Sequence, residues 1–346
     1  MPTLSPTAIA ARAEALAARL SPCTLCPRAC GVDRLAGARG ACGVGAEPEL
    51  ASFAAHYGEE PFLSGTHLAR PRGSGTVFLA GCNLRCHHCQ NWQISWGWRG
   101  GRGRRGVDLA AASLELQRRG CHNLNLVSPT HQTPGIVAAL ASATAAGLSL
   151  PVVWNSNAYE EVDVLALLEG VVDVWLPDLK YADEEAGHAL SGVARYPEVA
   201  RAAILEMARQ VGTEPVYDGE GLLVRGLAVR VLVLPEDLAG VESSLRWLRW
   251  ALGTDIPLSL MSQYGPTPGV RDPRMRRPLR PEEYQRAMDI ADQLGFDTAL
   301  IQPLEDRADL HYRPDFDDPE RPFADAEEYA RGCQALGNKI FKNLVS

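Results

Sequence analysis

The sequence lacks a long uninterrupted apolar run, an internal repeat and an excess of positive charge. Its 346 residues contain 34 Lys and Arg against 42 Asp and Glu, so the formal net charge is −8. That balance argues against a generic basic coat for nucleic acids, although local basic patches stay compatible with it. With 46% hydrophobic and 22% charged residues, the composition excludes fibrous, collagen-like and wholly disordered chains and is typical of a globular protein.

No export or membrane signal is recognisable. Charged residues interrupt the Ala-rich first twenty positions, which argues against a signal peptide. The stretch between His131 and Glu160 carries no charge, but it is mostly Ala, and Gly147 and Pro151 break it into a core helix and a strand. We therefore expect a cytoplasmic protein with reduced thiols and no membrane partner.

The cysteines are few but strongly grouped. Their number, nine, is odd, which argues against a complete disulfide framework. The two groups are Cys23, Cys26, Cys30 and Cys42, and then Cys82, Cys86 and Cys89. Tight groups of thiols in a reducing compartment indicate metal sites. Cys121 and Cys333 stand alone and are expected to be small buried hydrophobic residues.

From residue 76 onward, short apolar runs alternate with helical patterns. The expected strands cover 76–80, 122–127, 151–155, 172–176, 227–234, 257–261 and 298–301. The expected helices cover 108–119, 134–146, 160–169, 196–210, 240–252 and 281–294. Such alternation predicts an α/β fold with a parallel sheet, either doubly wound or a barrel. Polar residues repeatedly follow the strand ends, which favours a partial or full barrel.

The remaining segments suggest four units in the chain. An N-terminal helix is expected over 1–20, a four-cysteine metal-binding segment over 21–50, the barrel over 51–302 and a peripheral C-terminal extension over 303–346. Residues 51–74 are expected to be irregular. Helix 160–169 is expected to begin with Glu160 and Glu161, whose charges suit a helix N-terminus.

The strongest motif follows the first expected parallel strand. Cys82, Cys86 and Cys89 have the spacing C-x3-C-x2-C. Three thiolates can hold three corners of a [4Fe–4S] cluster and leave the fourth iron open to a small molecule. The alternative is a zinc knuckle in which His87 or His88 supplies the fourth ligand.

Four segments around this motif resemble one branch of the radical S-adenosylmethionine (SAM) superfamily, the bacterial pyruvate formate-lyase activating enzyme-like proteins. The segments are residues 74–86, 125–131, 176–181 and 260–264, and the resemblance covers roughly residues 20–302. It implies a (β/α)6 partial TIM barrel with Cys82, Cys86 and Cys89 as the catalytic cluster ligands. It also implies reductive cleavage of SAM to a 5′-deoxyadenosyl radical that abstracts hydrogen from a substrate. A reductant of flavodoxin or ferredoxin type and an unidentified substrate are the implied partners.

The same resemblance implies cofactor-binding residues at successive strand ends. Asp178 and Lys180 are similar to an Asp-x-Lys in which the acid helps hold a cation and the lysine faces SAM. Asn155 and Ser156 are similar to an Asp-Thr segment, and Arg230 is similar to an arginine that can bind a carboxylate. Plain structural explanations also exist, such as a surface ion pair or turn-forming residues.

This sequence departs from the branch at three further positions. Ser128, Thr130 and His131 follow the strand where the family has Gly-Gly-Glu, and they are expected either to bind SAM or to cap the next helix. His88 precedes the last cluster cysteine, where the family has an aromatic or apolar residue. Gln263 lies near the position of a family histidine and is a further candidate for cofactor binding.

The first cysteine group supplies four thiolates with the spacing C-x2-C-x3-C-x11-C. Four thiolates can close a zinc tetrahedron or hold an auxiliary iron–sulfur cluster. A set without an open position suits a structural zinc staple, and a second [4Fe–4S] cluster is the alternative. Nearby glycines allow the tight turns that either site needs.

Two basic segments are expected around the barrel mouth, in addition to three nearby tryptophans. The basic residues are Arg99, Arg102, Arg104 and Arg105, then Arg271, Arg274, Arg276, Arg277 and Arg280. They are either solvated loops or a means of attracting an anionic substrate, such as a phosphorylated compound, an acidic peptide or RNA. Trp92, Trp96 and Trp98 are expected to pack under a loop or to stack on a base. An electron carrier or metal-stapled interaction protein without radical chemistry is the alternative to an enzyme.

Overall fold

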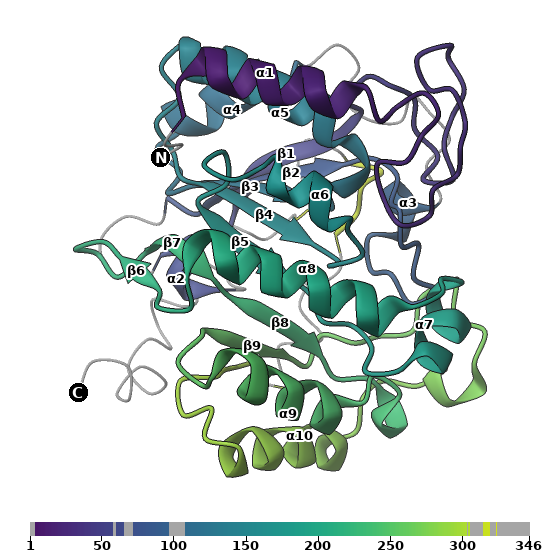
Figure 1. Cartoon of the computed structure of the whole chain (residues 1–346). Coiled ribbons are helices and arrows are strands. Elements are labelled where there is room, and N and C mark those ends of the chain that lie inside the picture. Colours follow the sequence, from purple (N-terminus) through teal and green to yellow (C-terminus); the bar gives the residue numbers. More distant parts are fainter. Residues whose placement is uncertain are drawn as a thin grey trace.

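The computed structural model describes residues 4–57, 60–65, 72–96, 108–302, 304, 314–318 and 323. Mostly parallel strands form its centre and helices cover them (Figure 1). The parallel strands of the larger sheet are β2 (Ser74–Leu79), β3 (Leu124–Val127), β4 (Val152–Ser156), β5 (Val174–Pro177) and β7 (Leu223–Leu227). A second parallel set contains β8 (Val229–Leu232), β9 (Leu258–Met261) and β10 (Leu300–Ile301). The predicted α/β class with a parallel sheet is confirmed.

The two sheets meet at the carboxyl end of β5. The backbone N–H of Leu179 donates a 2.9 Å hydrogen bond to the carbonyl oxygen of Arg230, and Asp178 and Arg230 form a parallel bridge. The parallel strands β2, β3, β4, β5, β7, β8, β9 and β10 therefore follow one another in chain order. This arrangement is consistent with the expected partial barrel, in which carboxyl ends of strands gather on one side.

Antiparallel strands border the larger sheet. β1 (Leu50–His56) pairs with β2, and β6 (Val216–Tyr217) pairs with β7. The expectation that residues 51–74 are irregular is therefore wrong for its first part. The β1 segment is rich in alanine, which has low β-propensity, and only its pairing with β2 makes it a strand.

Helices lie over the ends and the middle of the sheets. Their bounds are α1 (Pro6–Ala17), α2 (Pro61–Ser64), α3 (Trp92–Ser95), α4 (Leu109–Arg118), α5 (Thr133–Ala145), α6 (Val162–Ala166), α7 (Glu184–Ser191), α8 (Tyr196–Val211), α9 (Val241–Leu252) and α10 (Pro281–Gln293). Figure 1 shows α1, α4 and α5 at one end, α6 and α8 across the middle, and α9 and α10 beside β8 and β9. Within the described residues, no helix is long and apolar enough to cross a membrane.

Helix α6 begins later than expected. It starts at Val162, and Glu161 is its N-cap residue. Glu160 is instead 1% exposed and accepts a 3.3 Å hydrogen bond from the indole N–H of Trp154. Glu160 therefore serves the core rather than the helix terminus.

Part of the C-terminal segment packs on the sheet. Phe316 and Phe323 are buried, and their rings lie 5.2 and 5.5 Å from that of Phe78 on β2. These two residues are not peripheral, contrary to the expectation for 303–346. Most of that segment, including Cys333, lies outside the described residues, whereas Cys121 is buried as predicted.

Candidate functional site

The loop that carries Cys82, Cys86 and Cys89 is fixed by close backbone packing at its start. Gly81 has φ +75°, and a Cβ there would lie 2.6 Å from the carbonyl oxygen of Cys42, so only glycine fits without a shift. The next residue but one, Asn83, is fully buried. Its side-chain amide donates a 2.7 Å hydrogen bond to the carbonyl oxygen of Tyr159. The loop is thus tied to the segment after β4.

The three cysteines line one cavity of about 150 Å³ at the carboxyl ends of the strands. Most of the other predicted site residues line it too. These are Ser128, Asn155, Ser156, Asp178, Lys180, Arg230 and Gln263. They come from the ends of β3, β4, β5, β8 and β9, so the fold gathers residues that lie far apart in the sequence.

The thiols of this cavity are poorly solvated. Cys82 and Cys86 are each 6% exposed. Burial raises the pKa of the Cys89 thiol to about 12, and it also raises the pKa of Cys82. Buried thiolates need a compensating cation. Three soft sulfur donors in a closed space suit an iron–sulfur cluster or zinc.

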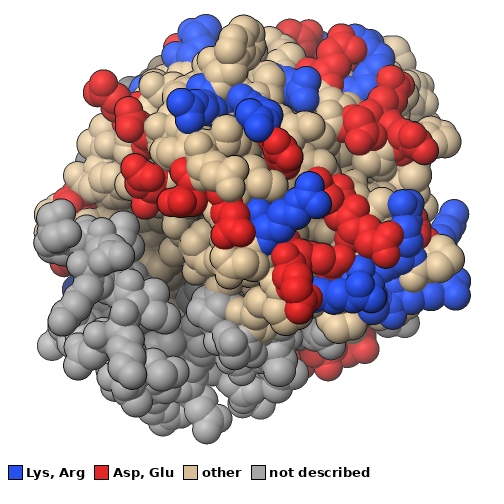
Figure 2. Space-filling view, turned by 90° about the horizontal axis from the view of Figure 1, so that it is seen from below, with Lys and Arg blue, Asp and Glu red and all other residues tan. Residues whose placement is uncertain are grey.

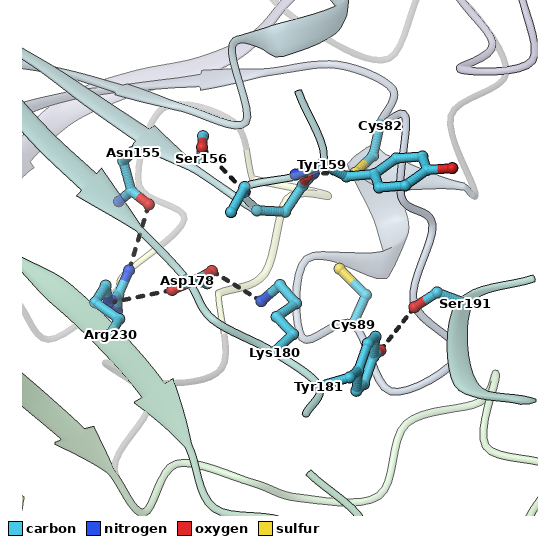
Figure 3. Close-up of polar contacts among 12 residues, drawn as sticks. Cys82, Cys89, Asn155, Ser156, Tyr159, Asp178, Lys180, Tyr181, Ser191 and Arg230 are labelled. Carbon is cyan, nitrogen blue, oxygen red and sulfur yellow. Dashed lines mark hydrogen bonds and ion pairs between the residues drawn. The ribbon is translucent and has the colours of Figure 1, made fainter. Parts of the chain in front are cut away.

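Lys180 supplies positive charge beside the cysteines. Its Nζ donates a 2.8 Å hydrogen bond to Asp178, and Figure 3 shows the Lys180 side chain between Asp178 and Cys89. Burial disfavours the ammonium charge, but the Asp178 carboxylate and the thiolates of Cys86 and Cys89 together raise the pKa of Lys180. Lys180 therefore stays protonated in this cavity.

Arg230 lies in a buried ion-pair network. Its Nε is 3.1 Å from Glu60 and 3.7 Å from Asp178, and its guanidinium donates a 3.5 Å hydrogen bond to Asn155. The resemblance implies that Arg230 binds a carboxylate, and the structure gives it two of the chain's own. Glu60, which also accepts a 3.0 Å hydrogen bond from Ser259, was missed because no local pattern links it to β8.

Thr130 and His131 do not line this cavity. Ser128 has φ +55°, and the short helix Thr130–Gln132 follows it, with Thr130 and His131 both buried. His131 Nε2 lies 2.8 Å from the carbonyl oxygen of Ala80, so this nitrogen carries the proton. His131 faces the first cysteine group instead. The structure therefore does not bring these two residues together with the other predicted SAM-binding residues.

Asn125 and His56 also line the cavity, although neither was among the predicted site residues. Asn125 on β3 is buried, and its side-chain oxygen has no hydrogen-bond partner among the described residues. His56 on β1 packs against Phe323, with ring centroids 4.5 Å apart and the ring planes tilted by 48°. The sequence held a signal for Asn125, because alternate residues of a strand face the same side. Asn125 and Val127 on β3 both line the cavity, as Thr76 and Phe78 on β2 do.

His88 also lines the cavity, in the position that departs from the family. Burial lowers its pKa to about 3, so the ring is neutral. It packs edge-on against Tyr181, with ring centroids 6.1 Å apart. His88 thus lies in an aromatic environment formed by Tyr181 and Tyr264.

Two of the five arginines in the second basic segment form ion pairs with neighbouring acidic residues. Arg274 pairs with Asp272 at 2.7 Å, and Arg277 pairs with Glu283 at 2.6 Å. Figure 2, seen from the side of α9 and α10, shows basic and acidic side chains interleaved. The first basic segment, Arg99 to Arg105, and Trp98 lie outside the described residues.

Trp96 packs under the cysteine loop. Its indole N–H donates a 3.1 Å hydrogen bond to the carbonyl oxygen of Cys86, and its ring lies 5.4 Å from that of Trp92. This contact favours the structural explanation for these two tryptophans over base stacking.

The first cysteine group lies beside the loop of the second. Cys23, Cys26, Cys30 and Cys42 line a separate void of about 10 Å³ together with Arg34 and His131. Among the described residues, no three His, Cys, Asp or Glu side chains stand at the spacing of a single-ion site. The eight described cysteines are all free thiols.

The family model of the Radical SAM superfamily matches residues 76–224. An uncharacterized protein of Methanocaldococcus jannaschii is 29% identical over 290 residues, which cover 80% of this chain and 75% of that protein. The matched region is thus similar to a radical SAM superfamily domain, and this match implies a [4Fe–4S] cluster and SAM as cofactors. The relative carries no information about the substrate.

The cavity suits these cofactors chemically. It presents three thiols, which is the ligand number of a cluster with one open iron. Asn125 lines the cavity, and its unsatisfied side-chain oxygen can accept a hydrogen bond from a ligand with N–H or O–H groups.

Proposed function

We propose that this chain, whose residues 76–224 match the radical SAM superfamily model, is an enzyme that uses Cys82, Cys86 and Cys89 to hold the cluster. The observation that carries the proposal is the position of the three thiols. They line the same buried cavity as Lys180 and Arg230, at the carboxyl ends of the parallel strands. Active sites of barrels lie at this end.

When bound, the cluster and SAM supply a one-electron cleavage that yields a 5′-deoxyadenosyl radical able to abstract hydrogen. The side chains of the cavity have other tasks. The Lys180 ammonium offsets the negative charge of the thiolates. The Asn157 amide lies 3.6 Å from the sulfur of Cys82 and donates to it, which fixes the orientation of that ligand.

We infer that Asp178, Asn155 and Ser156 contact SAM from the ends of β4 and β5. Asp178 is held by Lys180 and Arg230, so its carboxylate has a fixed position. Ser156 is 1% exposed and its hydroxyl accepts a 3.1 Å hydrogen bond from the N–H of Ala158. Rigid groups of this kind orient a bound molecule at little entropic cost.

Part of the cavity wall is apolar. Phe78, Leu84 and Met261 line it and are buried, and Phe323 lines it beside His56. These apolar side chains limit contact with water, which suits a reactive radical because open solvent allows side reactions.

We further propose that the substrate is a protein partner from which the enzyme abstracts hydrogen, as in the pyruvate formate-lyase activating branch. The supporting feature is the Asp178–Lys180 pair, which follows β5 as the Asp-x-Lys of that branch does. Fractionated cell extract tests this: a macromolecular fraction that raises the yield of 5′-deoxyadenosine supports a protein partner. If only a small-molecule fraction raises it, the partner proposal is wrong.

Cluster ligation is tested by replacing the three cysteines together with alanine in the full chain. After anaerobic purification, we expect C82A/C86A/C89A to lose the electron paramagnetic resonance signal that changes when SAM is added. The matched control is Cys121→Ala, since Cys121 is also buried but lies outside both groups. A SAM-responsive signal that survives in the triple variant would show that other residues hold the cluster.

A further inference from the structure

We propose that Cys23, Cys26, Cys30 and Cys42 hold a second [4Fe–4S] cluster, closed by four thiolates and balanced by the buried guanidinium of Arg34. This site is separate from the cavity described above. It does not rest on the proposed function, because its evidence lies in the N-terminal segment and the residues that contact it.

The backbone of the segment turns the four side chains inward. The N–H of Cys23 donates to the carbonyl oxygen of Val32 at 2.9 Å, and the N–H of Gly31 donates to that of Cys23 at 3.0 Å. A Cβ on Gly40 would lie 3.2 Å from the sulfur of Cys42 and 3.5 Å from that of Cys30. The segment is therefore closed around its own sulfurs by short turns.

A single zinc ion lies about 2.3 Å from each of its cysteine sulfurs. Among the described residues, no three His, Cys, Asp or Glu side chains stand close enough together to hold one ion, and the four cysteines line a void of about 10 Å³. The core of a [4Fe–4S] cluster is larger than one ion and binds four thiolates that stand farther apart. We therefore assign the four cysteines to a cluster rather than to zinc.

The surroundings of Arg34 call for negative charge at this position. Arg34 is 2% exposed, and its guanidinium donates to the carbonyl oxygens of Gly45 and His131. A third contact, at 3.9 Å, is the sulfur of Cys23. A guanidinium is always charged, and burying it is costly without an anion. None of the hydrogen bonds between Arg34 and the described residues reaches a carboxylate. Four cluster-bound thiolates would supply the negative charge that the guanidinium needs.

The segment also clamps the loop of the catalytic cysteines. Arg28 donates to the carbonyl oxygens of Asn83 and Leu84, and Arg85 donates to that of Ala41 at 3.0 Å. These contacts run from the first cysteine group to the second. Loss of the cluster at the N-terminal cysteines should therefore loosen the loop at Cys82. Loss of the catalytic cysteines should leave the N-terminal site intact.

Iron counting with Mössbauer spectroscopy tests the site on the full chain. We expect about eight irons per wild-type chain and about four in C82A/C86A/C89A, with the remaining cluster unresponsive to SAM. We expect Cys26→Ser to lose the cluster at the N-terminal cysteines and to lower the occupancy of the cluster at Cys82, Cys86 and Cys89. Cys121→Ala should keep both clusters. Zinc, or about no iron, in soluble C82A/C86A/C89A protein overturns the proposal.

The charge of Arg34 is tested by the reduction potential of the N-terminal cluster, which a purely structural role of Arg34 would not change. In the C82A/C86A/C89A background, Arg34→Gln should shift the reduction potential of the remaining cluster to more negative values, and Arg34→Lys should restore most of it. The control is Arg39→Gln in the same segment, because Arg39 is half exposed and pairs with Glu49 at 2.6 Å. Equal potentials in R34Q and R39Q would rule out charge balance by Arg34.

Discussion

The backbone N–H of Cys82 donates a 3.2 Å hydrogen bond to the carbonyl oxygen of Cys42. This bond joins the last cysteine of the first group to the first cysteine of the second. Since each sulfur lies within about 4 Å of its own backbone, the Cys42 and Cys82 sulfurs are no more than about 12 Å apart. The two cysteine groups therefore lie next to each other in the fold, although they belong to different segments of the chain.

Gly269 is a close contact under the catalytic loop. A Cβ at this position would lie 2.4 Å from the carbonyl oxygen of His87 and 2.7 Å from the ring of Trp96. We expect Gly269→Ala to push the loop away, to destabilise the protein by about 1–3 kcal/mol and to reduce iron binding at Cys82, Cys86 and Cys89. Thermal unfolding and iron analysis measure both effects.

Gly219→Ala is the matched control for that substitution, because nothing lies within 4 Å of its added Cβ. We expect a change within about 0.5 kcal/mol. If G269A and G219A behave alike, the loop does not depend on the close approach of Gly269.

Glu60 and Arg230 are expected to matter for stability more than surface ion pairs. Their side chains are 4% and 9% exposed, and removing one partner of a buried pair typically costs about 3–5 kcal/mol. Glu60→Gln should therefore lower the free energy of unfolding by several kcal/mol in denaturant titrations. Glu242→Gln, which breaks an exposed pair with Arg246, should cost only about 0.5 kcal/mol. Equal losses would contradict the importance of the buried network.

Lys180 is expected to strengthen SAM binding through the charge that it places in the cavity. Lys180→Met keeps the apolar stem but leaves Asp178 with Arg230 as its charged partner. We expect the Kd for SAM to rise at least about tenfold, which corresponds to about 1.4 kcal/mol. Calorimetric titration of the cluster-loaded protein measures it. Arg246→Met, an exposed site, serves as control, and an unchanged Kd in K180M would remove Lys180 from the SAM site.

Glu160 should make stability depend on pH. Burial raises its pKa from 4.5 to about 7, so the folded protein holds a proton that the unfolded chain releases between these values. The stabilisation is complete below pH 4.5 and is lost as the pH rises through about 7. By pH 8 the loss is about 3 kcal/mol.

Glu160→Gln should remove this dependence while keeping an acceptor for the Trp154 indole. We expect E160Q to unfold at a higher temperature than wild type at pH 8, with the advantage shrinking towards pH 5. An advantage that is the same at both pH values would mean that Glu160 is ionised in the folded protein.

Local patterns sufficed for much of the fold and for part of the site. The C-x3-C-x2-C spacing and the polar residues after successive strands identified the side chains that now line the cavity, because parallel strands bring their carboxyl ends together. Periodicity placed helices such as α8 and α10 within a residue or two. These features depend on neighbours in the sequence.

Features that depend on distant contacts were not predictable. Glu60 meets Arg230 across the fold, and no nearby residue signals that pair. His131 follows a strand as a ligand would, but the positive φ of Ser128 and the bond to Ala80 direct it to the first cysteine group. Strand β1 exists through its pairing with β2 rather than through its own composition.

The most direct test is the formation of 5′-deoxyadenosine by the anaerobically purified, chemically reduced protein in the presence of SAM. We expect wild type and Cys121→Ala to release 5′-deoxyadenosine and methionine in equal amounts, and C82A/C86A/C89A to release neither. Wild-type protein that binds its iron yet leaves SAM intact under reduction would contradict the assignment as a radical SAM enzyme and favour an electron carrier.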